Sequence, residues 1–168
     1  MKKLIILRGN SGSGKSTTAK ELQNKFGDNT MLISQDTIRR DMLKVKDGEN
    51  TLALPLMKEL LKYGHEHSEI VILEGIMVAD WYKSLFELAV ELYSDEVYAY
   101  YFDLSFEQTL ERHLTRSCCN EFGEEKMRAW WREKDYSSVL NEISIPFEKN
   151  IENTINEIIY AVLNKNHE

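Results

Sequence analysis

The sequence has little that would indicate export, a membrane anchor or a disulfide framework. Its 168 residues include only two cysteines, Cys118 and Cys119. Adjacent cysteines have neither the geometry of an ordinary disulfide nor the spacing of a zinc site. The longest apolar run near the start, residues 4–7, is too short for a signal peptide or a spanning helix. These absences predict a protein of the reducing cytoplasm that has no membrane segment.

Positive charge is also scarce. The chain has 21 lysines and arginines against 28 acidic residues, which gives a net charge of −7. A chain of this charge repels polyanions at long range, so nucleic acid is not expected as a partner that binds through counterion release. A small anion can still be bound locally by a few cationic groups.

Repeats, linkers and low-complexity stretches are missing as well, and the only prolines are Pro55 and Pro146. Hydrophobic residues make up 42% of the chain and charged residues 29%, which is the usual balance of a globular protein. A chain of this length fits one compact core. We therefore expect a single domain over residues 1–168.

Short apolar runs alternate along the chain with longer amphipathic stretches. The runs fall at residues 4–7, 31–33, 70–73, 97–102 and, more weakly, 143–145. The first four are continuous rather than alternating, which is typical of strands that are buried on both faces of a parallel sheet. The pattern predicts an open three-layer α/β domain, in which ligands bind beyond the carboxyl ends of the strands.

Helical patterns occupy the stretches between these runs. Residues 151–163 carry one apolar stripe, and a helix that opens at Asp80 carries a second stripe beginning with Trp81. Ser105 and Gln108 form a capping-box pattern, which predicts a helix start after the fourth strand. We interpret these stripes as surfaces that pack on the sheet.

A phosphate-binding pattern follows the first strand directly. Residues 9–16 match G-x-x-x-x-G-K-[ST] at every fixed position, and a helical run, residues 16–26, comes next. The three glycines allow a tight turn that brings backbone N–H groups against phosphate oxygens, beside the positive end of the helix dipole. Lys15 can reach the β- and γ-phosphates, and the Ser16 hydroxyl can ligate Mg²⁺. The predicted nucleotide-binding residues are Gly9, Asn10, Ser11, Gly12, Ser13, Gly14, Lys15, Ser16 and Thr17.

On the strength of this motif, the chain resembles P-loop kinases of the nucleoside- and nucleotide-kinase-like group over nearly its whole length. The resemblance implies a P-loop NTPase fold with a five-stranded parallel sheet in the order 2-3-1-4-5 and a helical lid. A GTPase would carry a D-x-x-G switch and an N-K-x-D guanine reader, and the sequence contains neither. ATP is therefore the expected phosphate donor.

Asp36 follows the second strand and emerges at the same sheet edge as the P-loop. A kinase that phosphorylates hydroxyl groups needs a carboxylate to orient the acceptor oxygen and accept its proton, and Asp36 is our candidate. Asp36 and Arg39 resemble an arrangement in zeta-toxin-like, chloramphenicol-phosphotransferase-like and polynucleotide 5′-kinase-like enzymes. That resemblance implies that Arg39 holds the acceptor or the transferring phosphoryl group, with Arg40 beside it. The alternative is a helix N-cap at Asp36 followed by two solvated arginines.

Glu74 closes the third strand, where the family often carries an acidic residue that acts on Mg²⁺ through water or on the substrate. The commoner residue there is Asp. Because the glutamate side chain is longer, three roles stay open for Glu74: metal binding, substrate binding and a structural role.

A lid segment is expected at about residues 117–135. Arg112 and Arg116 lie four residues apart and resemble the start of the lid in adenylate-kinase-like proteins, which implies that Arg112 stacks on adenine and Arg116 contacts the phosphates. Arg128 and Arg132 are candidates for closing over the γ-phosphate. The alternative is a surface helix whose arginines pair with neighbouring glutamates.

These features together predict an ATP- and Mg²⁺-dependent kinase. The acceptor is expected to be a hydroxyl group of a small molecule such as a nucleoside, a sugar, a nucleotide-sugar or an antibiotic. One alternative is a polynucleotide 5′-hydroxyl kinase, which the negative net charge opposes. The other is an ATP-binding switch or toxin that has no dedicated metabolite.

Overall fold

A computed structural model describes residues 2–114 and 124–164 of the chain. Five parallel strands form one sheet in the order β2-β3-β1-β4-β5. The strands are β1 (Lys3–Gly9), β2 (Thr30–Ser34), β3 (Ile70–Gly75), β4 (Val97–Asp103) and β5 (Glu142–Pro146). All five predicted strands are present, and the predicted sheet order is confirmed.

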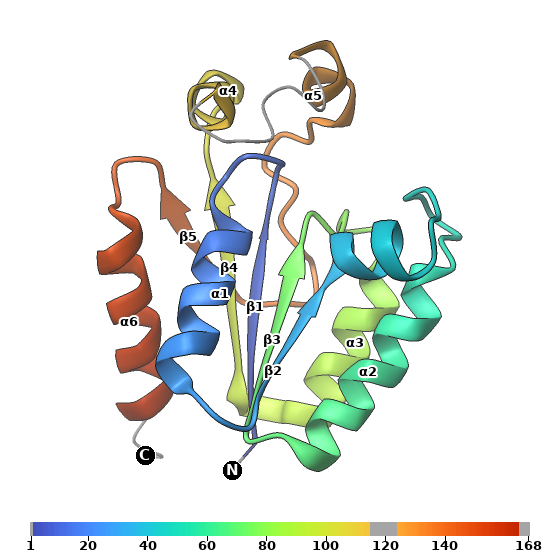
Figure 1. Cartoon of the computed structure of the whole chain (residues 1–168), viewed down its shortest axis with the longest axis vertical. Helices are drawn as coiled ribbons and strands as arrows, with labels where there is room; N and C mark the ends of the chain where they lie inside the picture. The colour runs from blue at the N-terminus through green and yellow to red at the C-terminus, as the bar shows by residue number, and fades with distance from the viewer. Residues whose placement is uncertain (1, 115–123, 165–168) are drawn as a thin grey trace.

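Helices cover both faces of the sheet. In chain order they are α1 (Lys15–Phe26), α2 (Ala53–His67), α3 (Lys83–Tyr93), α4 (Phe106–Leu114), α5 (Glu124–Trp130) and α6 (Ile151–Asn164), with a short π-helix η1 (Thr37–Met42) and a 3₁₀ turn η2 (Ser94–Glu96). Helices α1 and α6 lie on one face, α2 and α3 lie on the other, and α4 and α5 lie beyond the carboxyl ends of the strands (Figure 1). No helix in the described ranges has the length and apolar character needed to cross a membrane.

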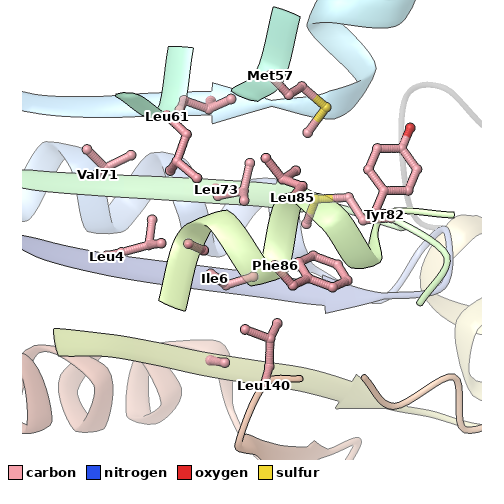
Figure 2. Close-up of a cluster of buried hydrophobic side chains, with 14 of the residues drawn as sticks. Leu4, Ile6, Met57, Leu61, Val71, Leu73, Tyr82, Leu85, Phe86 and Leu140 are labelled. Carbon is pink, nitrogen blue, oxygen red and sulfur yellow. The ribbon is translucent and has the colours of Figure 1, made fainter. Parts of the chain in front are cut away.

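The central strand shows why its apolar run is continuous. Leu4 and Ile6 of β1 belong to a buried cluster with side chains of α2 and α3, which Figure 2 shows. Ile5 and Leu7 belong to a second cluster with side chains of α1 and α6. All four side chains are fully buried. Because successive side chains of a strand point to opposite faces, a strand covered on both sides has to be apolar at every position.

Two of the predicted helix starts can be compared with the structure. The capping box is confirmed, since the backbone N–H of Ser105 donates to Oε1 of Gln108 at 2.8 Å and the backbone N–H of Gln108 donates to Oγ of Ser105 at 3.2 Å. The helix predicted to open at Asp80 begins instead at Lys83, after a turn over residues 79–82. Trp81 therefore lies in the loop after β3 and outside the helical stripe. In this position it lies next to the candidate functional site described below.

Candidate functional site

The P-loop connects β1 to α1 at the centre of the sheet. Its backbone takes positive φ at Gly9 (141°), Gly12 (80°) and Gly14 (104°), the three glycines of the motif. Side-chain-bearing residues rarely adopt these angles, so the loop path requires glycine there. A Cβ at Gly9 would also lie 2.9 Å from the backbone oxygen of Phe102. The motif therefore fixes the shape of the loop.

Lys15 begins α1 and turns back over the loop. Its Nζ donates to the backbone oxygen of Asn10 at 2.7 Å and to Oγ of Ser13 at 3.2 Å, and the residue is buried. A small pocket of about 50 Å³ lies in front of it, lined by residues 11–16 together with Asp36, Glu74, Gly75 and Ile76. We call this hollow the P-loop pocket. It combines backbone amides, a lysine and a helix N-terminus, which is the environment that binds phosphate.

Glu74 ends β3 beside the P-loop and is 3% exposed. Its carboxylate accepts a hydrogen bond from Oγ of Ser16 at 3.1 Å and a second from Oγ of Ser34 at 2.6 Å. Oxygen ligands from one or two carboxylates, completed by water and substrate phosphates, are what Mg²⁺ usually takes from a protein. The Ser16 hydroxyl and the Glu74 carboxylate therefore fit a magnesium ion. The described residues hold no cluster of three or more potential ligands of the His, Cys, Asp or Glu types.

Asp36 lies at the start of η1, on the rim of the P-loop pocket. Its carboxylate is 55% exposed and lies 3.1 Å from NH2 of Arg39 and 3.6 Å from Nε of Arg40. The Asp36 side chain makes no capping hydrogen bond to the helix. The Arg39 side chain is only 17% exposed. The Arg40 side chain is 43% exposed. The alternative of a capping aspartate followed by two solvated arginines therefore holds for the exposure of Arg40 but not for Arg39, and the Asp36 side chain does not cap the helix.

A larger hollow of about 740 Å³, which we call the main cavity, adjoins the P-loop pocket. Ser11 of the P-loop and three stretches of chain border it: residues 36–47 after β2, residues 76–81 after β3 and residues 126–132 of the lid segment. Ser11, Asp36 and Ile76 line both hollows. The P-loop pocket and the main cavity are therefore adjacent, and Asp36 is the one acidic side chain among the described residues that lines both.

A partly buried hydrogen-bond network joins residues beside the main cavity. The Tyr82 hydroxyl donates to Oδ1 of Asp47 at 2.7 Å, and Nε2 of Gln35 lies 2.7 Å from the same hydroxyl and 3.0 Å from Oδ2 of Asp47. Burial, followed by the contact with Asp47, raises the pKa of Tyr82 well above its ordinary value. Gln35 also packs closely against Gly75, where a Cβ would lie 2.4 Å from Oε1 of Gln35. The network connects the loop after η1, through Asp47, to Gln35 directly after β2 and to Tyr82 directly before α3.

Asn10 connects the P-loop to the lid segment. Its side-chain Nδ2 donates to the backbone oxygen of Arg132 at 2.5 Å, and its Oδ1 accepts the backbone N–H of Arg132 at 2.9 Å. The guanidinium of Arg132 lies 5.3 Å from the ring centre of Trp81 and lines the main cavity. This pair of hydrogen bonds places Arg132 beside the predicted site.

The structure does not bring Arg128 to the same place. Arg128 donates to Oε1 of Glu124 at 3.1 Å, and its guanidinium lies 4.1 Å from the ring centre of Phe106, in a separate hollow beside α4. This arrangement matches the alternative of an arginine paired with a neighbouring glutamate. The predicted roles of the Arg112 side chain and of Arg116 lie outside the described residues.

Arg8 is a residue that the sequence analysis missed. It is fully buried at the end of β1, where it forms ion pairs with Asp135 at 2.9 Å and Glu142 at 2.8 Å and donates two hydrogen bonds to the backbone oxygen of Met77. The sequence signal was an arginine that ends an apolar run directly before the P-loop. Arg8 joins the P-loop strand to the loop after β3, to the end of the lid segment at Asp135 and to the start of β5 at Glu142.

Two of three comparisons with known proteins relate this chain to others. A family model described as an AAA domain, AAA_33, matches residues 4–133. No curated protein matches the sequence. Three solved kinases share the fold. They are a gluconokinase from Sinorhizobium meliloti 1021 (15% identity, TM-score 0.68, 95% of this chain and 91% of that chain covered), APS kinase from Mycobacterium tuberculosis in complex with AMPPNP and APS (16%, 0.64, 94% and 95%), and shikimate kinase from Acinetobacter baumannii in complex with shikimate (16%, 0.61, 100% and 97%). At these identities the similarity concerns the fold.

Proposed function

The chain belongs to the AAA domain family AAA_33, and from that premise we propose that it is an ATP-dependent kinase that phosphorylates a hydroxyl group of a small molecule. The observation that carries the proposal is the position of Asp36, which lines both the P-loop pocket and the main cavity. The solved kinases that share the fold support it, because two of them have complexes whose names include a nucleotide analogue or a small-molecule substrate. The narrower similarity to zeta-toxin-like and polynucleotide-kinase-like enzymes stays a prediction.

In the proposed reaction, the acceptor hydroxyl oxygen attacks the γ-phosphorus of ATP. A new bond forms between that oxygen and phosphorus, the bond between the γ-phosphorus and the β–γ bridging oxygen breaks, and ADP leaves. Asp36 orients the hydroxyl and takes its proton. Its exposed carboxylate at the rim of both hollows suits this role.

The P-loop residues bind and orient the triphosphate. The backbone amides of residues 11–16 and Nζ of Lys15 stabilise the negative charge that shifts toward the β–γ bridging oxygen as the bond breaks. Bound between the Ser16 hydroxyl and Glu74, Mg²⁺ would supply charge neutralisation at the β- and γ-phosphate oxygens. Ser34 donates to the other Glu74 oxygen and so fixes the carboxylate.

Arginines complete the proposed site. Arg39, held by Asp36 and by the backbone oxygen of Val45 at 3.3 Å, faces the acceptor side. Arg132 is the lid arginine that we assign to the transferring phosphoryl group, in place of Arg128, because it lines the main cavity and is tied to Asn10 of the P-loop. Arg112 and Arg116 keep their predicted roles at the adenine and the phosphates.

A screen for phosphoryl transfer tests the proposal. The protein is incubated with ATP and Mg²⁺ and with panels of nucleosides, sugars, nucleotide-sugars, aminoglycosides and a 5′-hydroxyl oligonucleotide, and mass spectrometry detects the gain of one phosphoryl group. We expect transfer to a member of a small-molecule panel. Transfer only to the oligonucleotide, with a steep loss of activity as salt is added, would favour the polynucleotide kinase instead.

The Asp36→Asn variant is the control for that screen. Asparagine keeps the shape of the side chain but cannot take the proton, so transfer should fall by about 10²- to 10⁴-fold while the affinity for ATP stays within a few-fold of the wild type. Near-normal turnover by Asp36→Asn on the best acceptor would contradict the assigned base. Nucleotide binding without transfer to any panel would favour the ATP-binding switch.

A further inference from the structure

We propose that the acceptor carries an acidic group in addition to its hydroxyl, and that the cationic side chains of the main cavity bind that group. This inference rests on the proposed kinase function and specifies its substrate class. The acidic group is a phosphate, a sulfate or a carboxylate on a compact molecule.

The charge of the main cavity is opposite to the charge of the protein. Among the described residues, five cationic side chains line the cavity, against the two acidic side chains of Asp36 and Asp47, so this part of the lining has an excess of three positive charges. The whole chain carries a net charge of −7. The cations are Arg39, Arg40, Lys46, Lys126 and Arg132. In a chain with fewer basic than acidic residues, this local concentration attracts an anion to the cavity.

The cavity's own acidic groups leave most of that positive charge uncompensated. Asp36 pairs with Arg39 and Arg40, and Asp47 accepts hydrogen bonds from neutral groups, namely Gln35, Tyr82 and the backbone N–H of Gly48. Within residues 2–114 and 124–164, no acidic side chain lies within ion-pair distance of Lys46, Lys126 or Arg132. In addition, Nε of Arg39 is buried and has no hydrogen-bond partner among the described residues. These groups are available to a ligand.

The triphosphate of ATP does not account for all of these cations. The P-loop pocket has its own donors in the backbone amides of residues 11–16 and in Lys15, and none of the five cavity cations lines that pocket. Lys46 comes from the loop after η1, and Lys126 comes from α5 in the lid segment. Both lie on walls of the main cavity, on the acceptor side of Asp36. An acidic group there would be held while the hydroxyl of the same molecule reaches Asp36.

The rest of the cavity lining indicates what the acceptor is like apart from its acidic group. Ile76, Val78, Trp81, Ala129 and Trp130 provide apolar surface between the charged groups. The volume of about 740 Å³ lies within the usual range for small-molecule sites, roughly 300–1,000 Å³. The acceptor that fits is a molecule of metabolite size with an apolar or ring-shaped face and one acidic end.

Calorimetric titration with matched pairs of probes tests this inference without requiring turnover. A non-hydrolysable ATP analogue and Mg²⁺ keep the P-loop pocket filled, and the titrants are ribose against ribose 5-phosphate, glucose against gluconate, and adenosine against adenosine 5′-monophosphate. We expect the charged member of at least one pair to bind at least tenfold more tightly than its neutral partner. The pairs distinguish phosphate from carboxylate. Equal binding within every pair, or no binding by any charged member, would overturn the inference.

Two variants locate the bound anion. Lys46 and Lys126 are both exposed, so the double variant Lys46→Ala/Lys126→Ala should fold normally. The tenfold advantage of the charged probe should fall to less than threefold in this variant and should persist in Lys62→Ala, which changes an exposed lysine of α2 that does not line the cavity. An unchanged advantage in the double variant would overturn the inference. If the charged probes bind as expected but the transfer screen finds no acceptor, the kinase proposal fails while the anion site stands.

Discussion

The P-loop pocket and the main cavity lie side by side but are built in different ways. The pocket is formed by the P-loop, the end of β3 and the start of α1, and its Lys15 and Glu74 side chains are buried and already hydrogen-bonded to neighbouring groups. The cavity is formed by loops and short helices, and its cations are mostly exposed. A rigid sheet edge suits the phosphate donor, which is the same in many kinases. Loops suit the phosphate acceptor, which differs from one kinase to the next.

Three links connect these two regions. Asp36 lines both regions, and Asn10 bonds the P-loop to Arg132. Arg8 joins β1 to the loop after β3 and to the end of the lid segment. Variants in the pocket, in the links and in the sheet below should therefore have different effects. Pocket variants should affect the nucleotide, link variants should affect both regions, and sheet variants should affect stability alone.

Lys15→Ala should have the largest effect, because it removes the cation of the P-loop pocket. We expect kcat/KM for phosphoryl transfer to fall by roughly 10³-fold or more, since the charge on the transferring group loses a preorganised donor. Steady-state kinetics measures the loss. Lys20→Ala, an exposed lysine on the same helix, is the matched control and should stay within twofold of the wild type. Similar kinetics for the two variants would remove Lys15 from the mechanism.

Arg8→Met should break the connection between the two regions. The change leaves Glu142, whose side chain is 1% exposed, without its buried cation, so unfolding free energy should fall by about 3–5 kcal/mol. Urea denaturation gives the value. Lys83→Met removes only a weak surface pair, with Nζ 4.0 Å from Glu87, and should cost about 0.5 kcal/mol or less. If the Arg8 variant is as stable as the control, the buried ion pairs are not the link described here.

Glu74→Gln should weaken the metal site with little change to the main cavity. Glutamine removes the negative charge that the Ser16 hydroxyl contacts, so we expect the affinity for Mg²⁺ to fall about 10- to 100-fold. Calorimetry of nucleotide binding at increasing Mg²⁺ concentrations measures this shift without turnover. The affinity of the charged probes for the main cavity should be unchanged. An unaltered requirement for Mg²⁺ would favour the purely structural role of Glu74.

Tyr100→Phe, in strand β4, should have the smallest effect, which is a change in how stability depends on pH. Burial, with a smaller contribution from the charge of Glu157, raises the pKa of Tyr100 to about 12, above the ordinary value of about 10. A folded state that resists ionisation loses stability as the pH rises from 10 to 12, because the unfolded chain releases the proton more readily. Between pH 9 and pH 11, the free energy of unfolding should therefore fall by about 1 kcal/mol less in the variant than in the wild type. Urea denaturation at pH 9, 10 and 11 measures the difference. Parallel curves would show that Tyr100 does not contribute.

The P-loop pocket could be predicted from the sequence because most of the residues that form it are adjacent in the chain. Residues 9–16 are contiguous, and the φ angles at Gly9, Gly12 and Gly14 follow from the motif. Glu74 could be found because it ends an apolar run. The five strands were predicted correctly because strands covered on both faces form continuous apolar runs.

The main cavity could not be predicted in the same way, because its described lining comes from Ser11 of the P-loop and from three further, separate stretches of chain. Nothing in the sequence indicates that Lys46, Trp81 and Lys126 line one hollow. The π-helix η1 has no sequence pattern that we can identify, and Trp81 was assigned to a helix that begins only at Lys83. The helical spacing of Arg128 and Arg132 did not reveal that the helix ends at Trp130, which lets the two arginines lie in different hollows.

A crystal structure with a non-hydrolysable ATP analogue and Mg²⁺ tests the central claim most directly, since the claim assigns the nucleotide and the acceptor to different hollows. We predict that the γ-phosphate lies in the P-loop pocket beside Lys15, that the metal lies between Ser16 and Glu74, and that the main cavity stays open on the far side of Asp36. A triphosphate that instead occupies the main cavity, against Lys46 and Lys126, would contradict the account.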